Sequence, residues 1–243
     1  MLKRSAWIGG AVTLLIALIV IAPAALIPML LSSPHVRLEH AQGTVWRGDA
    51  ETFINNQHIG ELSWEVKPLE LIEGRLTVDL TLERDGVSIA GVSTSNADGH
   101  EISLSGVIGS RLVNVFTLAY DIRMSGELTI NDVKLRVDDQ KKVESAEGTV
   151  SWDGGPVRFK LANVVHEVTL DPVLGTLSQG SSFVELTVQR LRAQKPVLAF
   201  RIDPETGWVH LRAFPAFLEF ANVPPNYLMQ DSDFIFEVSQ KLF

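Results

Sequence analysis

The chain has 243 residues, a formal net charge of −8 at pH 7 and no cysteine. An acidic chain is unsuited to binding nucleic acid, because neutralising phosphates requires a basic surface. Without cysteine the protein has no disulfide, no thiolate metal ligand, no cysteine nucleophile and no lipidated cysteine. The length is enough for one large domain or two small ones, each able to bury a core.

The first predicted element is a membrane anchor. The run Ala6–Leu31 contains 26 consecutive residues without a charge and is preceded by Lys3 and Arg4. A transmembrane helix needs roughly twenty apolar residues, and basic residues stay on the cytoplasmic side. The sequence therefore predicts a single-pass inner-membrane protein whose N-terminus is cytoplasmic. Residues 1–34 would form the cytoplasmic tip and transmembrane anchor, and residues 35–243 a periplasmic domain.

A cleaved signal peptide is the alternative interpretation of the same run. Ile8–Ile21 would be its apolar region, and Ala22-Pro23-Ala24 would be an A-x-A cleavage site. The apolar run continues to Leu31, whereas a mature protein usually turns polar directly after the cut. This continuation favours an uncleaved anchor, and both interpretations place residues 35–243 across the membrane.

The exported part is dominated by alternation of apolar and polar residues, which is the pattern of strands with one buried face. The clearest examples are Leu76–Leu82 and Val184–Val188, with shorter ones at Ile102–Leu104 and Phe234–Val238. There are about twelve to fourteen candidate strands and no long helical pattern. Because parallel sheets need crossover helices, the chain is predicted to be all-β, with a large antiparallel sheet domain that is curled or built in two parts.

Two short stretches could be helical. Leu69–Glu73 follows Pro68, a residue that is tolerated in the first turn of a helix. Leu112–Ala119 has apolar residues at helical spacing, although a buried strand fits so short a run equally well. Turn signals that supply a positive or a preset φ separate the candidate strands, and they are Asn55-Asn56, Asp85-Gly86, Asp98-Gly99, Asp153–Pro156 and Pro204–Gly207.

A short internal repeat is also visible. Glu39–Gly48 reads E-H-A-Q-G-T-V-W-R-G, and Glu144–Gly154, 105 residues further on, reads E-S-A-E-G-T-V-S-W-D-G. Each segment contains G-T-V, a tryptophan and a final glycine. The repeat predicts two related β halves, at about 35–140 and 141–243, with a chance match as the alternative.

No pattern of catalytic or metal-binding residues is present. The six histidines lie in separate predicted strands or turns, and the sequence has no G-x-S-x-G, P-loop or G-x-G-x-x-G motif. The charged cluster at residues 138–142 is typical of a solvated loop, because a calcium site needs more carboxylates. We therefore predict that the protein is not an enzyme, that it has no catalytic, cofactor-binding or metal-binding residue, and that it needs no cofactor. The tryptophans predicted to pack within strands are Trp46, Trp64, Trp152 and Trp208.

The region from Gly43 to Leu76 reads G-T-V-W-R-G-D-A and, further on, G-E-L-S-W-E-V-K-P-L-E-L-I-E-G-R-L. It resembles the type II secretion system protein N family of Gram-negative bacteria. G-T-x-W alone is a weak signal, but W-x-x-x-P and a glycine at this distance make the pattern more specific. The residues that carry the resemblance, interpreted as a structural motif, are Gly43, Thr44, Trp46, Gly48, Leu62, Trp64, Pro68, Leu71, Gly74 and Leu76.

The resemblance implies an accessory inner-membrane component of the machinery that moves folded periplasmic proteins across the outer membrane. Such a component is expected to be a non-catalytic assembly or scaffold protein that binds other type II secretion components. Addition of a partner's strand to a sheet edge is a natural way for a β domain to bind. No family motif is recognisable from Arg190 to Phe243.

Two other functions remain open from the sequence. The first is a periplasmic lipid-binding or lipid-transfer protein with an open apolar β groove, because half-buried strands behind an anchor also resemble proteins of that kind; lipid is then the partner. The second is an outer-membrane barrel, suggested by the terminal Phe243. Because the chain has two tyrosines, it is poor in the aromatic residues that flank such barrels.

Overall fold

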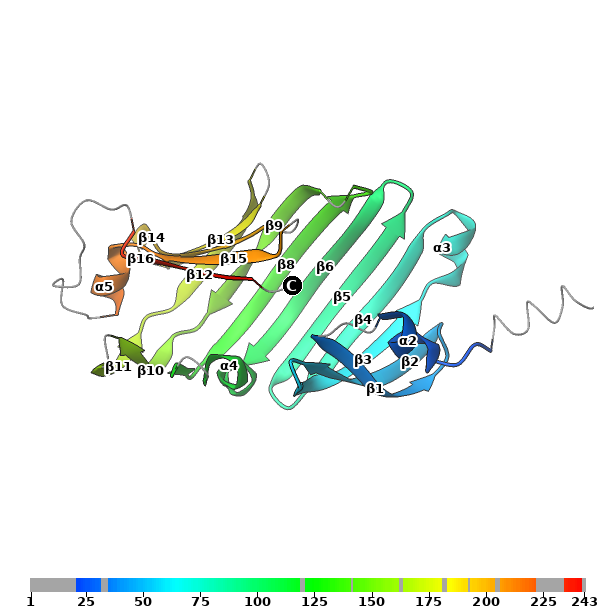
Figure 1. The fold of residues 1–243 in the computed structure, drawn as a ribbon, viewed down its shortest axis with the longest axis horizontal. Helices are drawn as coiled ribbons and strands as arrows, with labels where there is room; N and C mark the ends of the chain where they lie inside the picture. The colour runs from blue at the N-terminus through cyan, green and yellow to red at the C-terminus, as the bar shows by residue number, and fades with distance from the viewer. Residues whose placement is uncertain are drawn as a thin grey trace, which may run out of the picture. The chain divides into compact units, whose positions relative to one another are not determined.

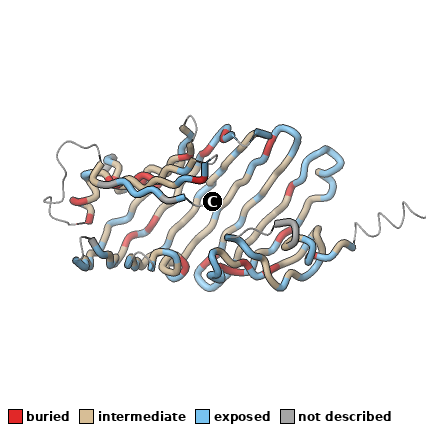
Figure 2. The backbone as a smooth tube through the Cα atoms, in the orientation of Figure 1, coloured by how far each residue is buried: buried red, intermediate tan, exposed pale blue. Residues whose placement is uncertain are grey.

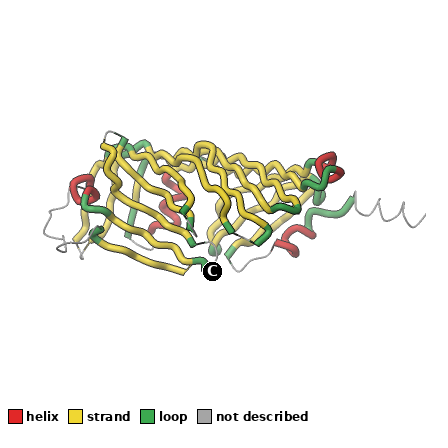
Figure 3. The backbone as a smooth tube through the Cα atoms, turned by 90° about the horizontal axis from the view of Figure 1, so that it is seen from above, coloured by secondary structure: helices red, strands yellow, loops and turns green. Residues whose placement is uncertain are grey.

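The computed structural model describes residues 21–31, 35–118, 121–140, 142–161, 164–180, 183–191, 193–203, 206–221 and 234–241. Antiparallel strands make up most of this part of the chain, and the helices are short (Figure 3). This confirms the predicted all-β, antiparallel class. By its internal contacts the chain divides into two compact units, Met1–Arg84 and Asp85–Phe243 (Figure 1), which we call unit 1 and unit 2.

Unit 1 is built on an antiparallel sheet in which each strand pairs with the next along the chain. The turn between its second and third strands consists of Asn55 and Asn56, with φ of 49° and 65°. Asparagine tolerates this left-handed conformation, so the predicted turn signal is confirmed. The elements of unit 1 are α2 (Leu26–Leu31), β1 (Val36–Gly43), β2 (Arg47–Ile54), β3 (Gln57–Val66), α3 (Pro68–Ile72) and β4 (Leu76–Arg84).

The short helix α3 interrupts the sheet between β3 and β4. It begins at Pro68, and Lys67 before it is extended (φ −90°, ψ 94°), as steric conflict with a following proline requires. Gly74, with φ of 77°, ends the turn and returns the chain to β4. The predicted helical turn Leu69–Glu73 is therefore confirmed, with both ends one residue earlier.

Residues 22–24, which fall within the predicted anchor Ala6–Leu31, are hydrogen-bonded to the turn between β1 and β2. The N–H of Ala24 donates to the carbonyl of Gly43 (3.1 Å), and the N–H of Val45 donates to the carbonyl of Ala22 (3.0 Å). Together these bonds form a short antiparallel bridge at Pro23, a residue that has no N–H to leave unpaired. Residues 22–24 thus belong to the folded unit.

Most of the predicted anchor Ala6–Leu31 lies outside the described residues. Among the residues that are described, no helix is both long and apolar enough to cross a membrane. The described end of the run does not form one helix up to Leu31, because Ala22 and Ala24 are bonded to unit 1 and α2 starts only at Leu26.

Unit 2 has a large antiparallel sheet with strand order β5-β6-β8-β9-β12-β13-β14-β15-β16 and a small sheet with order β11-β10-β7. The hairpin β10–β11 leaves the large sheet after β9, and β12 then returns to pair with β9. The elements of unit 2 are β5 (Val87–Asn96), β6 (Gly99–Gly109), α4 (Ser110–Thr117), β7 (Arg123–Met124), β8 (Glu127–Asp138), β9 (Val143–Trp152), β10 (Gly155–Leu161), β11 (Val164–Leu170), β12 (Val173–Gln179), β13 (Val184–Arg190), β14 (Ala193–Ile202), β15 (Trp208–Ala213), α5 (Ala216–Phe220) and β16 (Phe236–Lys241).

The segment for which the sequence allowed either helix or strand is helical. It forms α4, with Leu112 buried. The side-chain amide of Asn114 donates to the carbonyl of Met124 and accepts from its N–H, both at 2.8 Å. These two bonds attach β7 to α4 and explain how a two-residue strand is held in place.

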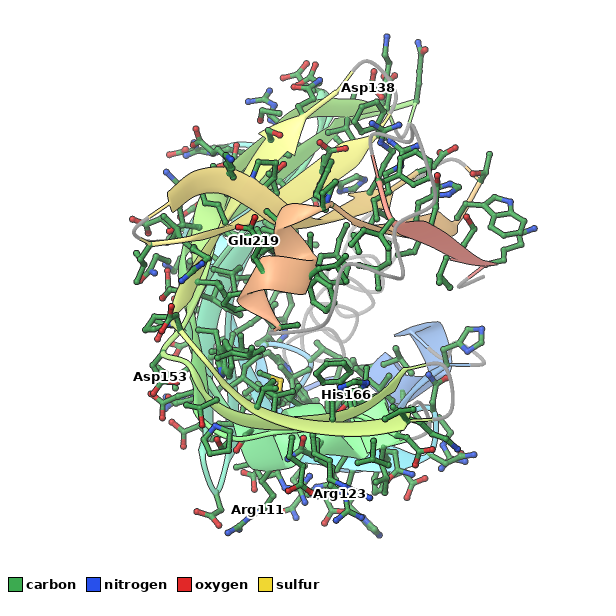
Figure 4. All side chains as sticks on the ribbon, turned by 90° about the vertical axis from the view of Figure 1, so that its left-hand side faces the viewer. Arg111, Arg123, Asp138, Asp153, His166 and Glu219 are labelled. Atoms are coloured by element: carbon green, nitrogen blue, oxygen red, sulfur yellow. The ribbon has the colours of Figure 1, made fainter. Side chains whose placement is uncertain are left out.

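The small sheet and α5 form a second layer over part of the large sheet (Figure 4). The helix packs on β14, and apolar residues of both layers line one shared cavity. The predicted curl of the sheet is not found. The second layer covers the part of the apolar face that lines the cavity, so burial of that part does not require the sheet to curl.

The opposite face of the large sheet carries ion pairs between neighbouring strands. Arg136 of β8 lies between Glu144 of β9 (2.7 Å) and Glu101 of β6 (3.8 Å), and Arg201 of β14 contacts Glu185 of β13 (3.0 Å). Exposed pairs such as those of Arg136 contribute little to stability, whereas the pair of Arg201 and Glu185 is partly buried. These ion pairs explain why every second residue of the alternating sequences is polar, because the polar residues lie on this face of the sheet.

The two segments of the internal repeat have different local structures. Glu39–Gly48 covers the end of β1, a turn and the start of β2, whereas Glu144–Gly154 lies within β9 and directly after it. The shared G-T-V letters therefore do not mark equivalent strands. Trp46, predicted to lie in a strand, lies in the turn between β1 and β2.

Candidate functional site

Trp64 is the centre of the family motif predicted from the sequence. It is 5% exposed and forms a cluster with buried Ala24 and Ala50. Its indole N–H donates to the carbonyl of Thr44 (3.2 Å), so the buried polar group is satisfied. The motif tryptophan thus joins β3 to the turn that precedes β2 and to the segment that leaves the predicted anchor.

The G-T-V-W turn around this tryptophan has strict steric requirements. Gly43 has φ of +88°, and a Cβ atom there would lie 2.5 Å from the carbonyl oxygen of Arg47. A Cβ on Gly48 would lie 2.6 Å from Cζ2 of Trp64. The hydroxyl of Thr44 lies within hydrogen-bond distance of the backbone of Arg47. Geometry therefore requires glycine at positions 43 and 48, and the hydroxyl of Thr44 adds hydrogen bonds to the turn.

The remaining motif residues are not all close to Trp64. Leu62 lies on β3, where it pairs with Leu82 and Ala50, and Trp46 accepts a hydrogen bond at its carbonyl from Val66 (2.7 Å). The second half of the motif forms α3 and the entry to β4, where leucine side chains are exposed. The residues of this second group are Pro68, Leu71, Gly74 and Leu76.

Charged groups lie beside the motif on unit 1. The ammonium group of Lys67 lies 2.9 Å from the carboxylate of Asp79. This hydrogen bond, supported by the nearby Glu70 and Glu65, raises the pKa of Lys67 above its ordinary value of 10.5. Asp79 and Trp64 both line a hollow of about 510 Å³ beside the motif turn.

A second tryptophan, Trp152, has a similar position in unit 2. It is 5% exposed, ends β9, and its indole N–H donates to the carbonyl of Ser125 (2.9 Å). A Cβ atom on Gly126 would lie 2.8 Å from this indole nitrogen. One side of Trp152 faces an apolar cavity of about 360 Å³ between the two layers of unit 2.

The small sheet of unit 2 presents an unusual edge. All seven residues of β11 pair with β10 without a register shift, and β11 is the end strand of its sheet among the described strands. Val164 and Val165 are about half exposed, at 50% and 48%. Natural edge strands usually carry lysine, proline or a bulge that discourages pairing with another chain. β11 has none of these three devices, and its one carboxylate, Glu167, is paired with Arg158 of β10 at 3.3 Å, whereas β1 is bulged near His40, with φ of 54°.

In the described part of the chain, the histidines are not gathered into a metal site. No group of three or more His, Asp or Glu side chains there is placed to hold a metal ion. His166 of β11 stacks on Phe159, with ring centroids 5.3 Å apart, and Figure 4 places it between the small sheet and α5. Its Nε2 atom is buried without a hydrogen-bond partner. Arg111 and Arg123 lie on the other side of the small sheet.

The fold and the motif geometry define an antiparallel β-sheet protein of two units, each with a buried tryptophan bonded to a turn. The chain belongs to the type II secretion system (T2SS), protein N family, whose model matches residues 34–202. The predicted family is therefore confirmed, and the match extends beyond Arg190, where no motif was recognisable. Comparison with curated proteins and with solved structures gave no significant match.

Sequence reasoning missed two features of unit 2. The sequence V-V-H-E-V-T-L of β11 shows a strand but not that the strand lies at an edge, because edge position depends on the topology of the whole unit. The cavity beside Trp152 has one weak signal, Gly175, which lies inside an alternating strand where a side chain would be expected.

Proposed function

We propose that the protein is an accessory, non-catalytic component of the type II secretion machinery, a scaffold that acts by binding other secretion components. The observation that supports this most directly is the family match over residues 34–202. Members of this family are components of a secretion system and not known enzymes. Family membership also associates the chain with the cell envelope, in agreement with the charge-free run near its N-terminus.

The β11 edge is the contact surface in this proposal. A partner strand that pairs with β11 gains backbone hydrogen bonds, and the half-exposed valines offer apolar contacts at the same edge. β11 also lies within the residues matched by the family, whereas β16, another end strand, lies beyond residue 202. A contact that serves the function of the family is expected at β11, because this edge lies within the matched residues.

Substitution of Val165 by lysine tests this surface in the source bacterium. A strain without the gene, complemented with Val165→Lys, should release about tenfold less of a secreted reporter enzyme, because a cost of roughly 1.4 kcal/mol in partner binding has that effect. The matched control is Val238→Lys on β16, where the side chain is 54% exposed. The control should secrete normally.

Equal secretion by the two variants would reject β11 as the contact. The deletion strain tests the role in secretion separately from the contact surface. Normal secretion without the gene would reject the whole proposal. A photoreactive residue at Thr169, an exposed position on β11, should crosslink to another secretion component. Recovery of lipid alone would count against a protein partner.

The proposal includes retention of the N-terminal segment as a single-pass inner-membrane anchor with a cytoplasmic N-terminus. Cleavage after Ala24 would release a segment whose backbone is bonded to Gly43 and Val45 and would remove buried Ala24 from the core. These contacts favour an uncut chain. The intact mass of protein purified from membranes should include residues 1–24. A mature chain that starts near residue 25 would contradict the anchor.

The motif residues of unit 1 serve the fold in this proposal and do not contact a partner. Trp64 is buried, and Gly43 is confined by backbone atoms. Secretion by motif variants should therefore fall in proportion to the amount of folded protein. A variant such as Gly74→Ala that abolishes secretion at normal protein levels would instead indicate a contact role.

A further inference from the structure

The cavity of unit 2 is formed by both layers of the unit. On one side it is lined by β8, β9, β12, β13 and β14, and on the other side by β7, β10, β11 and α5. Its volume of about 360 Å³ is within the range of small-molecule sites. Part of the space results from Gly175, which pairs with Val150 and Val188 and contributes no side chain between them. The apolar side chains that line this space gain free energy when an apolar ligand removes them from water.

The lining selects against peptides. The side chains that face the cavity are apolar, and the indole nitrogen of Trp152 is already bonded to Ser125. A peptide inside would leave its N–H and C=O groups without partners, which is unfavourable in such a space. A hydrocarbon chain has no such groups. At the roughly 25 Å³ per carbon implied by benzene in a 150 Å³ cavity, the space holds about fourteen carbons.

One cationic side chain lies on the cavity face of the sheet. Trp152 pairs with Val173, and Val173 pairs with Arg190, so the three side chains lie on the same face. The guanidinium of Arg190 lies over the ring of Phe220, 5.8 Å from its centroid, and Phe220 lines the cavity. Arg190 is therefore at the rim of the apolar space.

The hydrogen bonds of Arg190 are incomplete. Its Nη2 contacts the exposed carboxylate of Asp171 at 2.7 Å, while Nε is buried and has no hydrogen-bond partner. A buried donor of a charged group is costly to leave unpaired. An anionic head group beside Arg190 would supply an acceptor, and a carboxylate matches the fork of donors that guanidinium presents.

An apolar path leads from the cavity across the sheet. Val150, which lines the cavity, is followed through successive strand pairs by Ile130, Gly106 and Ile89. β8 and most of β5 and β6 are half-buried or exposed, as Figure 2 shows. The apolar face therefore continues from the cavity across β8, β6 and β5.

We propose that the cavity of unit 2 binds one long-chain fatty carboxylate, with its hydrocarbon chain between the two layers and its carboxylate at Arg190. The volume fits a single chain, and the rim offers one guanidinium. This binding activity goes beyond the proposed role in secretion and does not depend on it.

The test uses the full chain in native membranes and a myristic acid analogue with a diazirine in its chain. After illumination, mass spectrometry should find the label on peptides that contain Val150, Trp152 or Val188. Unlabelled myristate should compete. Val150→Phe, which fills the cavity, should lower the labelling of these peptides about tenfold, as a binding cost of roughly 1.4 kcal/mol would do. Ser151→Phe, on the same strand but on the opposite face, should retain it.

Substitutions of Arg190 test whether this side chain binds the carboxylate of the ligand. Arg190→Gln should reduce labelling about tenfold, because a charge-assisted hydrogen bond is lost, and Arg190→Lys should keep part of it. Competition by unlabelled myristate in the wild-type chain remains informative if a variant fails to fold. Three outcomes would overturn the proposal: equal labelling of Val150→Phe and Ser151→Phe, labelling confined to residues 1–34, or labelling by a diacyl phospholipid probe and not by the fatty acid probe.

Discussion

Trp64 of unit 1 and Trp152 of unit 2 are buried in the same kind of local structure. Each lies near the end of the second strand of a hairpin, and each indole N–H donates to the carbonyl of a residue that precedes the hairpin's first strand. Each also has a glycine beside the ring, Gly48 in one case and Gly126 in the other. A large aromatic residue can lie this close to the backbone only where the neighbour has no side chain.

The two sites differ in what covers the tryptophan. In unit 1, Ala24 and Ile27 of the N-terminal segment, with Ala50, Val78 and other apolar residues, pack around Trp64. In unit 2 the covering layer leaves an apolar space beside Trp152. The same local structure is therefore consistent with a structural core in one unit and with a binding cavity in the other, and the covering segment decides which.

Truncation of the two tryptophans should show this difference most strongly. Trp64→Ala should lower the free energy of unfolding of unit 1 by about 4 kcal/mol, because the cluster with Ala24 and Ala50 loses its largest side chain. Trp152→Ala should cost unit 2 less, about 2–3 kcal/mol, because one side of the ring already faces free space. Hydrogen exchange in increasing denaturant measures each unit separately. A larger loss for Trp152→Ala would contradict the comparison.

Enlarging a neighbouring residue should have opposite effects in the two units. Ala50→Val in the Trp64 cluster should destabilise unit 1 by about 1–3 kcal/mol, since Ala50 is fully buried and its surroundings are filled. Val188→Ile should be neutral or should stabilise unit 2 by up to about 0.8 kcal/mol, because the added methylene enters the cavity. Denaturant midpoints for each unit give the result. Similar losses in both would show that the cavity is already filled.

Alanine substitutions at two motif glycines of unit 1 distinguish the cost of a positive φ from the cost of a steric clash. Both have positive φ, but a Cβ on Gly43 would meet the carbonyl of Arg47, whereas Gly74 has no atom within 4 Å of that position. Gly43→Ala should cost about 2–3 kcal/mol, and Gly74→Ala about 1 kcal/mol from conformation alone. Thermal unfolding compares the two. Equal costs would mean that the turn relaxes around the new methyl group.

The smallest predicted effect concerns the ion pair of Lys67 and Asp79. Because the folded state raises the pKa of Lys67, the pair stabilises unit 1 below pH 10.5, and this contribution is lost as the pH rises through the folded pKa. The thermal midpoint of the wild type should exceed that of Lys67→Met slightly at neutral pH, and the two should converge in strong alkali. Asp79→Asn is the control and should remove the same increment. If the thermal midpoints of the wild type and Lys67→Met still differ in strong alkali, the difference comes from packing of the Lys67 side chain and not from the ion pair.

The sequence predicted what depends on local pattern. The alternation at Leu76–Leu82 and Val184–Val188 corresponds to β4 and β13, and Pro68 and Gly74 delimit α3 as expected. These signals act over a few residues, so the rest of the fold does not change them. For Leu112–Ala119 the pattern was too short to decide, and the contacts of Asn114 with β7 favour the helix.

The sequence did not predict what depends on long-range packing. The repeated G-T-V letters led to a comparison of Trp46 with Trp152, whereas the structure makes Trp64 the counterpart of Trp152, because hydrogen bonding and burial decide equivalence. The edge position of β11 and the rim position of Arg190 require the order of the strands. That order arises from pairings between residues far apart in the chain.

The bridge at Pro23 has a mechanical consequence. Among the described residues, backbone hydrogen bonds to the G-T-V-W turn begin at Ala22, directly after Ile21. A force applied at Ile21 therefore loads the Ala22–Val45 and Ala24–Gly43 hydrogen bonds before it reaches the paired strands of the sheet.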